Sequence, residues 1–584
     1  MKFRSPYSLY SILFIIFSTV AICYSPFRNP ENLVAPEKIG GDGKDYYSYL
    51  VSFFIDESLV KAEDPGYIIA APAGTINMHT VGTAIMQSPF FMAGYVWAKV
   101  ANYDLNGYSE PFQKMVGFAA FFYVLTGFIF LRKLLLNIGF HDFVIAVILL
   151  LLYFGTNLIN FTINEPSMSH IYSFSLISSF LYYVHRLFSG YTGKSIYASA
   201  FLLGLVIITR PINGLIIFVV PFFLESMNDF KQKITDIIKD KKRVFVSLII
   251  LIGVLSIQST YWYIHNRTFI QWTYKDYGFY FSKPHLFSML LSFRCGLFIY
   301  TPLYFISLFG LIFLFKENKF KSWSIILFMF LCAYIFSCWC SWPYYDGIGV
   351  RVFADFSAIT GILIAKLISS VSNRLLNCIL FLTLAAGLFI YQIFYYQYQT
   401  GILPGAAMNY EKFKYIFLKT SAKYKFAVGG YGDLPPYSKH PLKVTDSYEN
   451  DFKKSKENVE KIDNHLCLPF HGQEYGGDYK YINTADPCKL YVEISLKRME
   501  PFVNSSSEAI VVYSIESPDN SKKYYMNFKM NETPSAACHE WKQYYYTINS
   551  TYKIEGGDRL KIYIWNKDKQ YFYVDDYKIK VYRY

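Results

Sequence analysis

Long apolar stretches separated by short polar loops fill the first 396 residues of the chain. A helix needs about 20 apolar residues to cross a bilayer, although helices inside a large bundle can be shorter or interrupted. The pattern therefore predicts a polytopic α-helical membrane region over 1–396, with about eleven spans. They are expected at 8–24, 114–135, 142–160, 169–187, 196–209, 212–226, 244–263, 295–315, 323–341, 353–370 and 376–396.

Two of the intervening loops are long, and both fall on the side of the membrane opposite the N-terminus. The first, about 25–113, contains the stretches Tyr46 to Phe54 and Pro89 to Val100, which are apolar or amphipathic but too short to span. Such stretches predict interfacial or re-entrant helices. The second long loop, about 264–294, is rich in aromatic residues.

The pattern changes after residue 396. Residues 397–465 form a mixed, Lys-rich connecting region, and 466–584 hold short alternating runs bounded by Gly, Asn, Asp and Pro. Period-2 runs at such spacing predict an all-β, jelly-roll-like sandwich. Strands are expected near 490–496, 509–513, 524–528, 544–548, 560–565 and 571–581. The last run looks like the closing strand of a jelly-roll carbohydrate-binding module, but a purely structural sandwich would need the same strand.

Composition and charge support a membrane protein. Of 584 residues, 53% are hydrophobic, 20% aromatic and 17% charged, whereas soluble domains have about 25% charged residues. The net charge of +13 does not indicate nucleic-acid binding, because Lys and Arg fall mainly in short loops. The positive-inside rule places the N-terminus in the cytoplasm and everything after about residue 397 outside. The first apolar run lacks a small-residue cleavage site and is expected to remain as a signal anchor.

Nine cysteines are present, six of them in or beside apolar spans. The other three, Cys467, Cys488 and Cys538, lie in the polar C-terminal part and allow one disulfide with one thiol left over. Cys338 and Cys340 are too close in sequence for a C-x-x-C metal or redox motif.

Two carboxylates lie just beyond the first span, in the segment GGDGKDYY at 40–47. On one helical turn Asp42 and Asp45 would project to similar faces, with Tyr46 and Tyr47 beside them. A carboxylate there could deprotonate an acceptor hydroxyl, a role that typically contributes about 10²- to 10⁴-fold in rate. A glycine-rich turn with solvated acids would give the same pattern, so composition alone leaves both interpretations open.

The second outer loop carries Glu165, followed by Pro166 and then His170. Glu165 suits the positive N-terminal end of the next helix, and Pro166 suits its first turn. His170 lies within the apolar stretch, where ionisable groups are functional candidates. A capping role and a functional role for Glu165 both stay open.

Two arginines occupy unusual positions. Arg210, with the proline after it, interrupts the apolar run 196–226, where an unpaired guanidinium would be costly. Arg351 closes the outer loop 339–351, which also contains Trp342 and two glycines. Both arginines face outward against the positive-inside rule, and a phosphate would suit them because guanidinium binds it bidentately. The alternatives are a structural pairing with an acid of a neighbouring helix and an interfacial aromatic belt.

The order and sidedness of these residues resemble the GT-C superfamily of integral-membrane glycosyltransferases, over about residues 8–396. The bacterial branch related to protein O-mannosyltransferases and to aminoarabinose transfer onto lipid A is the most similar in pattern. The likeness consists of Asp42 followed by paired tyrosines, Glu165 in the next outer loop, the break at Arg210 and a late Gly-x-Arg ending at Arg351. Walker A, H-E-x-x-H, nucleophile-elbow and zinc-site motifs are missing from the sequence.

The resemblance implies transfer of one sugar from a polyprenyl-phosphate donor, usually with inversion, on the outer face of the bacterial cytoplasmic (inner) membrane. Carried over, Asp42 is the catalytic base, and Glu165 positions acceptor or donor. Arg210 and Arg351 would hold the lipid phosphate, and His170 would line the site.

The resemblance also bears on the rest of the site. Tyr46 and Trp342 would offer aromatic surfaces to the sugar and the prenyl chain. The chain departs from the family pattern because Asp42 and Asp45 compete for the role of base, and we prefer Asp42. Relatives with lipid-phosphate donors generally need no metal, and the first loop has no D-x-D motif. No metal and no other cofactor is therefore expected.

The predicted function is an inverting glycosyltransferase of the cell envelope. Its expected partners are the polyprenyl-phosphate-sugar donor, a glycan, lipid or protein acceptor, and membrane lipids, without nucleic acid. A transporter or flippase for a lipid-linked or anionic substrate is the main alternative, although transporters often repeat a broken helix in both halves and one break, at Arg210, is evident here. A second alternative is an oligosaccharide ligase with a diphosphate-linked donor.

Overall fold

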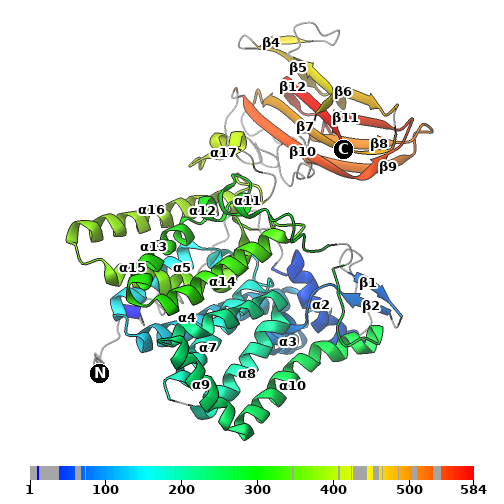
Figure 1. Cartoon of the computed structure of the whole chain (residues 1–584). Coiled ribbons are helices and arrows are strands. Elements are labelled where there is room, and N and C mark those ends of the chain that lie inside the picture. The colour runs from blue at the N-terminus through cyan, green and yellow to red at the C-terminus, as the bar shows by residue number, and fades with distance from the viewer. Residues whose placement is uncertain are drawn as a thin grey trace. The chain divides into compact units, whose positions relative to one another are not determined.

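The computed structural model divides the chain into two compact units, which are described separately (Figure 1). The helical unit comprises Met1–Glu31, Ala35–Leu291 and Gly296–Gln392, and the β unit comprises Asn32–Val34, Ser292–Cys295 and Ile393–Tyr584. The residues that the structure describes are 10–11, 38–58, 68–72, 74–190, 192–274, 277–344, 347–405, 408, 410–421, 424, 443–450, 459–462, 465–484, 486–502, 509–530, 539 and 541–584.

Helices account for most of the first unit, with one short hairpin. The hairpin strands are β1 (Ile68–Ala71) and β2 (Gly74–Asn77). The helices begin with α2 (Asp42–Phe54), α3 (Gly82–Val100), α4 (Glu110–Ile138), α5 (Asp142–Gly155), α6 (Leu158–Ile163), α7 (His170–Phe188), α8 (Thr192–Thr209), the 3-10 helix η2 (Pro211–Phe223) and α9 (Met227–Lys239). They continue with α10 (Lys241–Asn266), α11 (Leu286–Leu291), α12 (Leu297–Tyr300), α13 (Pro302–Glu317), α14 (Lys319–Cys338), the 3-10 helix η3 (Arg351–Phe356), α15 (Ser357–Ser370) and α16 (Arg374–Gln399).

Five helices in the described part of the chain are long and apolar enough to cross a membrane, as in a multi-pass membrane protein. They are Glu110–Ile138, Lys241–Asn266, Lys319–Cys338, Arg351–Ser370 and Arg374–Gln399. A sixth crossing is available if η2 and α9, bent by 109°, count as one span. The expected spans from 114–135 onward all fall on helical segments, whereas most of 8–24 lies outside the described residues. The total of eleven spans stays a prediction.

The break expected at Arg210 is present. Helix α8 ends at Thr209, and η2 starts at Pro211, which has no N–H with which to continue the α-helical hydrogen bonding. Near this break, the start of α3 packs tightly, because a Cβ on Gly82 would lie 2.4 Å from the nitrogen of Thr209. The chain therefore places Arg210 at the end of a helix and beside the first outer loop.

Helix α7 lies inside the unit, with 14 of its 19 residues buried. It packs against α4 on one side and α8 on the other. Small residues permit such close approach between membrane helices: a Cβ on Gly127 of α4 would lie 2.6 Å from the Phe174 ring of α7. The N-terminus of α7, where His170 lies, is thereby fixed inside the bundle.

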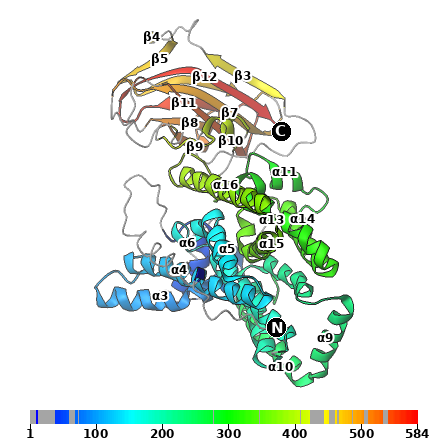
Figure 2. The same ribbon diagram turned by 90° about the vertical axis from the view of Figure 1, so that its left-hand side faces the viewer.

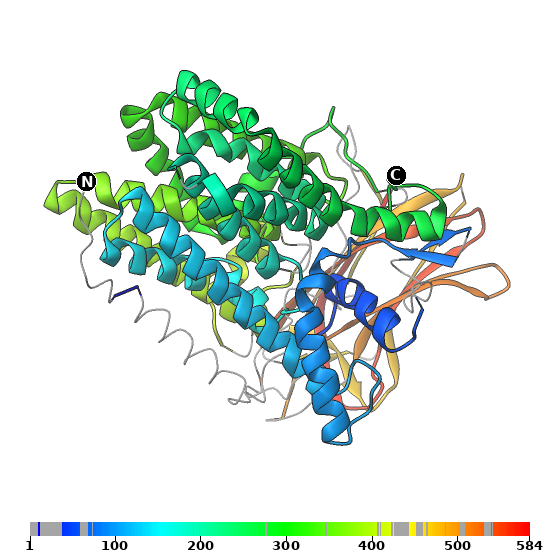
Figure 3. The same ribbon diagram turned by 90° about the horizontal axis from the view of Figure 1, so that it is seen from below.

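The long segment 25–113 contains a helix at each of the two stretches that the sequence singled out, while their interfacial or re-entrant position stays a prediction. The stretch from Tyr46 falls in α2 and that from Pro89 in α3, although both helices begin earlier than expected. The antiparallel hairpin β1–β2 was not expected. Figure 3 shows this hairpin beside α2 and α3. Asn77 at the end of β2 donates a hydrogen bond to the main-chain oxygen of Asp45 at 2.7 Å, which fastens the hairpin to α2.

The β unit contains two antiparallel sheets and the short helix α17 (Tyr410–Ile416). One sheet has the order β10-β7-β12-β5-β4, with β3 paired to β12 (Figure 2), and the other has the order β6-β11-β8-β9. The strands are β3 (Val444–Asn450), β4 (Glu460–Ile462), β5 (His465–His471), β6 (Tyr475–Ile482), β7 (Cys488–Met499), β8 (Ile510–Glu516), β9 (Lys522–Lys529), β10 (Lys542–Ile554), β11 (Arg559–Trp565) and β12 (Tyr571–Arg583). Side chains from both sheets form one apolar core, including Val492, Val511 and Ile562.

The six expected strands correspond to β7 through β12. The pattern missed β5, which contains Pro469, and β6, which contains two glycines, because both residue types are unfavourable in strand interiors. Strands β3 and β4 fall in the expected connecting region 397–465. Cys467 and Cys488 have free thiols, and Cys538 lies outside the described residues.

Candidate functional site

The start of α2 places Asp42 against Arg351. Gly41 precedes the helix with a φ of 53°, a left-handed conformation that suits glycine. The carboxylate Oδ2 of Asp42 lies 2.6 Å from Nη2 of Arg351, which is 309 residues away in sequence. The side chains keep 21% and 10% of their surfaces exposed, respectively. The acid expected to act as base and an arginine expected to hold phosphate are therefore in direct contact.

Arg351 controls the protonation of Asp42. Burial by itself would raise the pKa of this carboxyl, but the charge of Arg351 and its hydrogen bond to Asp42 act in the opposite direction and lower the pKa to about 2. Asp42 is therefore ionised at neutral pH and binds a proton weakly while Arg351 is its partner.

The loop that carries Glu165 packs against the first turn of α2. A Cβ on Gly43 would lie 2.0 Å from Oγ of Ser167, so this position accepts glycine and no larger residue without rearrangement. Glu165 itself is half-buried and accepts a 3.3 Å hydrogen bond from Nδ2 of Asn160. The loop between α6 and α7 thus lies against α2, while α6 holds the Glu165 carboxylate, and a positioning role for Glu165 stays a prediction.

A second charged cluster surrounds Asp355, one turn after Arg351. Its Oδ1 lies 2.6 Å from Nδ1 of His170, and its Oδ2 accepts hydrogen bonds from Nδ2 of Asn213 at 2.8 Å and Nη1 of Arg210 at 3.3 Å. Asp355 is fully buried, whereas Arg210 keeps 17% of its side chain exposed. One carboxylate therefore joins α7, the α8–η2 break and η2, and it supplies the acid partner for Arg210 that the sequence left open.

Charged residues of both clusters lie within electrostatic reach of the same tyrosine, Tyr46. Tyr46, on α2, accepts a 3.4 Å hydrogen bond from Oγ of Ser169. Burial raises the pKa of Tyr46, and Arg210, Asp42 and Arg351 all lie within electrostatic reach of its hydroxyl. Tyr46 therefore stands as a neutral hydroxyl among the charged groups of both clusters.

Asp45 has a different partner from Asp42. Its Oδ2 lies 3.5 Å from Nδ1 of His79, and the two side chains are only 6% and 7% exposed. The ring of His79 lies 4.6 Å from that of Tyr46, centroid to centroid. Asp45 is therefore nearly closed to solvent, whereas Asp42 is more open.

The outer loop before Arg351 contributes aromatic rings in two ways. Trp342 is buried and stacks on His285, with the ring centroids 5.2 Å apart. Tyr344 lies within electrostatic reach of Arg210 and Arg351, and burial raises the pKa of its hydroxyl. Of the two rings, that of Tyr344 is thus the one within electrostatic reach of the arginines, whereas the sequence had indicated Trp342.

Sequence reasoning missed Asp355, Asn213 and His79. Asp355 could have been found, because it is an acid within the apolar run 353–370 and lies four residues after Arg351. His79 had no such signal, since it lies in a long outer loop and reaches α2 through the unexpected hairpin.

Among the residues that the structure describes, no group of three or more His, Cys, Asp or Glu side chains could hold a metal ion. Asp42 and Asp355, which could serve as ligands, are each bonded to an arginine. A reaction without metal stays a prediction.

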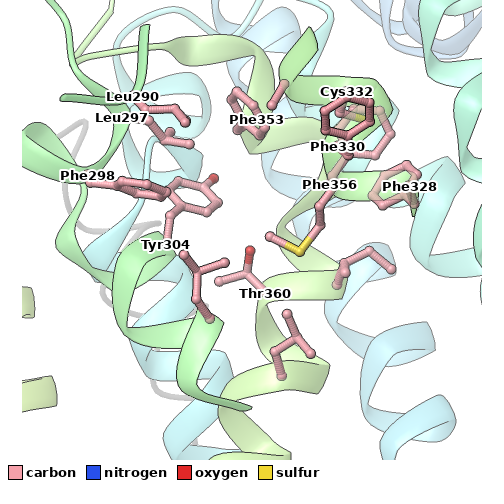
Figure 4. A pocket seen from close by; sticks show the side chains of 15 residues that line it. Leu290, Leu297, Phe298, Tyr304, Phe328, Phe330, Cys332, Phe353, Phe356 and Thr360 are labelled. Carbon is pink, nitrogen blue, oxygen red and sulfur yellow. The ribbon is translucent and has the colours of Figure 1, made fainter. Parts of the chain in front are cut away.

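An apolar cavity of about 260 Å³ lies beside η3, between α11–α12, α13, α14 and α15 (Figure 4). Phe353 and Phe356, which flank Asp355 in sequence, form part of its wall. Tyr304 also lines it, and its hydroxyl lies 3.4 Å from Oγ of Ser357. One short helix thus presents charged side chains to the site and aromatic side chains to the cavity.

Comparisons with known proteins give structural likenesses but no sequence relatives. No family model and no curated protein matches the chain. The arabinosyltransferase EmbB from Mycobacterium smegmatis, a glycosyltransferase of the GT-C superfamily, is similar over 97% of this chain and 67% of its own, with 9% identity and a TM-score of 0.32. An arabinose-bound α-L-arabinofuranosidase, MgGH51, is similar over 24% of this chain and 23% of its own, with 12% identity and a TM-score of 0.16.

Both TM-scores are below 0.5, so neither likeness carries an argument about the reaction. A proposal about the reaction therefore depends on the geometry of the site. A partly open carboxylate lies next to Arg351, and both Arg351 and a second arginine, Arg210, lie within electrostatic reach of the Tyr46 hydroxyl. Such an arrangement can bind an anion and accept a proton in the same place.

Proposed function

We propose that this chain is an inverting glycosyltransferase that moves one sugar from a polyprenyl-phosphate donor to a glycan, lipid or protein acceptor. The reaction would take place at the outer face of the bacterial cytoplasmic membrane, with the β unit outside the cytoplasm. The observation that carries the proposal is the contact of Asp42 with Arg351, beside the cluster of Asp355, Arg210 and His170. It joins a base to two cations among helices apolar enough to cross a membrane.

The donor phosphate would bind between Arg210 and Arg351. A polyprenyl-phosphate sugar is a phosphodiester with one negative charge, and the phosphate gains a second charge when the sugar leaves. Arginines that are already oriented stabilise this developing charge without reorganisation. Asp355 orients Arg210 through a hydrogen bond at 3.3 Å.

Asp42 would act as the base. The acceptor oxygen bonds to the anomeric carbon from the face opposite the phosphate, the carbon–oxygen bond to phosphate breaks, and Asp42 takes the hydroxyl proton. Phosphate binding to Arg351 competes with the Asp42 contact, so it would free the carboxylate when the donor is in place. Asp45 is the weaker candidate, since its side chain is 6% exposed and paired with His79.

The cavity beside η3 would receive the first isoprene units of the donor. Its lining is almost entirely apolar and aromatic, and η3 also bears Arg351 and Asp355. A lipid whose phosphate lies at the arginines could therefore extend into apolar surroundings within a few bonds. Glu165 would orient the sugar or the acceptor from the second outer loop, and Tyr46 and Trp342 would provide aromatic surfaces.

We also infer that the β unit is a jelly roll. From β5 to β12, the strands β5, β7, β10 and β12 belong to one sheet and β6, β8, β9 and β11 to the other. The orders β10-β7-β12-β5 and β6-β11-β8-β9 match an eight-stranded sandwich of two Greek keys, which supports this inference. Binding of carbohydrate by this unit stays a prediction.

The test is transfer of labelled sugar by the purified full-length protein in lipid vesicles. The donors are farnesyl-phosphate-linked pentoses and hexoses, each also offered as the diphosphate. Asp42→Asn and Asp42→Ala should lose about 10²- to 10⁴-fold in rate, while Asp236→Asn, on the exposed face of α9, should keep full activity. Full activity in both Asp42 variants would remove Asp42 as the base.

The same assay separates the alternatives. Transfer from the monophosphate donors supports the proposal, whereas transfer from the diphosphate donors alone would indicate a ligase. Uptake of labelled donor into vesicles without any product would indicate a transporter.

A further inference from the structure

Helix α9 and the start of α10 form a corner after η2 (Figure 2). The axis turns by 109° between η2 and α9, so α9 does not continue in the direction of the apolar segment before it. The hydroxyl of Ser226 caps α9 by accepting a hydrogen bond from the N–H of Asp229 at 3.2 Å. The carboxylate of Asp240 caps α10 by accepting from the N–H of Arg243 at 3.1 Å. Both helix starts at this corner are therefore set by the local sequence.

Helix α9 has an apolar stripe that the protein leaves partly uncovered. Residues three or four positions apart share one face of a helix, and on this face lie Met227, Phe230, Ile234, Ile237 and Ile238. None of the 13 residues of α9 is buried, and Met227 and Ile238 keep 52% and 59% of their surfaces exposed. Isolated helices of about 12–15 residues are marginal in water, and most helices are stabilised by packing an apolar face. The stripe is therefore open to a further apolar partner.

Unpaired lysines surround this stripe. Four of them lie at the corner, namely Lys231, Lys233, Lys241 and Lys242. With about 100° of rotation per helical residue, Lys231 lies at one edge of the stripe and Lys233 at the other. Within the part of the chain that the structure describes, none of the four forms an ion pair, whereas Lys239 pairs with Asp236 at 3.0 Å. The corner thus combines an apolar face with cations that lack an acid partner there.

An apolar stripe bordered by lysines fits the surface of a bilayer. Lysine stems cover apolar surface while their ammonium groups reach the lipid phosphates. A helix in this position lies along the membrane plane, which agrees with the 109° turn after η2. Helix α10, which follows directly, is apolar enough to cross a membrane. A second copy of this chain on the same face would bring like charges together, which opposes that pairing.

We propose that α9 is an interfacial helix and that its lysines, with Lys241 and Lys242, bind the headgroups of anionic phospholipids. The apolar stripe enters the boundary between headgroups and acyl chains, and the lysines reach the phosphates around it. The positive-inside rule places this corner at the cytoplasmic face, where basic clusters beside a span attract anionic lipids. The lipid site does not depend on the proposed glycosyltransferase activity, because none of these residues belongs to the candidate functional site.

The test is hydrogen exchange of the α9 amides in the full-length protein. The protein is placed in phosphatidylcholine nanodiscs that contain a rising fraction of phosphatidylglycerol, and inorganic phosphate is added to a separate phosphatidylcholine sample. A lipid that binds the folded helix slows exchange of its amides. Phosphatidylglycerol should therefore increase the protection of α9, and high salt should reduce this increase. Inorganic phosphate should have no effect.

The double variant Lys231→Gln/Lys233→Gln should lower the apparent affinity for phosphatidylglycerol by about 10- to 30-fold, since each cation near an anionic surface contributes about fivefold. Lys231→Arg/Lys233→Arg should keep it, because the charges remain. Lys239→Gln is the matched control, because Lys239 lies on the same helix but pairs with Asp236. Met227→Ser/Ile238→Ser should weaken protection in both kinds of nanodisc, since it shortens the apolar stripe without changing the charge.

Several outcomes would overturn the lipid site. Equal protection in nanodiscs with and without phosphatidylglycerol would remove the anionic lipid, and equal protection by inorganic phosphate would indicate a simple anion site. Equal loss in Lys239→Gln and in the double lysine variant would show that the stripe has no specific role. Protection that rises with protein concentration alone would indicate a second copy of the chain. Exchange of the buried α7 amides reports folding, and if a variant fails this check, wild-type protection that does not respond to salt overturns the assignment.

Discussion

Each unit of the chain contains an arginine–carboxylate pair at 2.6 Å, and the two pairs are built in opposite ways. In the β unit, Arg498 and Glu500 are two residues apart, so an extended chain places them on one face. They are 1% and 5% exposed, and the guanidinium lies 4.3 Å from the Phe572 ring centroid. In the helical unit, Asp42 and Arg351 are 309 residues apart and keep 21% and 10% of their surfaces exposed.

The two pairs therefore differ in how far solvent or a ligand can reach them. Arg498 and Glu500 are closed to solvent, so neither side chain can exchange its partner for a ligand. A pair brought together by the fold and left partly open can exchange one partner for a ligand. Under the proposed function, Arg351 would exchange Asp42 for a phosphate, whereas Arg498 is closed off within the β core.

The largest effect on stability is expected in the β unit. Arg498→Ala leaves the Glu500 carboxylate buried without its cation and should destabilise this unit by about 3–5 kcal/mol. Hydrogen exchange of the β7 and β12 amides in the full-length protein measures the loss. The double variant Arg498→Met/Glu500→Leu should recover most of the protection. Normal protection in Arg498→Ala would show that the sealed pair contributes little.

Removal of Arg351, the partner of Asp42, should affect the proposed reaction. Arg351→Ala should lower kcat/KM for the donor by about 10²- to 10³-fold, because one preorganised cation is lost from the leaving phosphate. Helix content and Tm should change little. Arg374→Ala, exposed at the start of α16, is the control. Equal loss in both variants would mean that Arg351 has no specific role in donor binding.

The close contact between Gly43 of α2 and Ser167 of the loop before α7 can be disrupted by adding one methyl group. Gly43→Ala puts a Cβ 2.0 Å from Oγ of Ser167 and should destabilise the helical unit by about 1–3 kcal/mol. The double variant Gly43→Ala/Ser167→Gly should recover part of this loss in a thermal unfolding assay. Gly193→Ala, which meets open space in α8, should be neutral or stabilising. A neutral Gly43→Ala would indicate a looser loop.

The smallest effect is the pH dependence of the open pair. The pKa of Asp42 is about 2 in the folded protein, below the value near 3.9 of an unfolded chain. A depressed pKa contributes stability that is present above about pH 4 and is lost as the pH falls toward 2. The contribution should be on the order of 1 kcal/mol, discounted because the side chain is partly exposed. The Tm difference between wild type and Asp42→Asn should therefore shrink from pH 5 downward, and a constant difference would contradict the assignment.

Local patterns predicted much of the secondary structure. Apolar runs located most of the helices from α4 to α16, but not α9 and α11, which lie in stretches expected to be loops, and alternating runs located β7 to β12. The break at Arg210 followed from its proline. Strands β5 and β6 were missed because they contain Pro469 and a pair of glycines, which weaken the alternating signal.

The site was only partly predictable. Arg210, His170 and Arg351 were singled out from charge in unusual places, since an ionisable group near a membrane needs a reason, and Asp42 was singled out through the family resemblance. His79 was not found, because nothing in the sequence of its loop indicates that a hairpin brings it to Asp45. Trp342 was selected for its aromatic character, but Tyr344 is the ring of that loop within reach of both arginines.

The sequence by itself determined which segments are apolar enough for a membrane, where the helix breaks, and which charged residues are costly enough to require partners. These properties depend on adjacent residues in the sequence and on the free energy of transferring side chains from water into the membrane. Both can be read from the local composition. The tertiary structure alone decided the pairings: Asp42 with Arg351, Asp45 with His79, and Asp355 with Arg210 and His170. Contacts between residues more than 30 positions apart depend on how helices and loops pack, and no local pattern encodes that geometry.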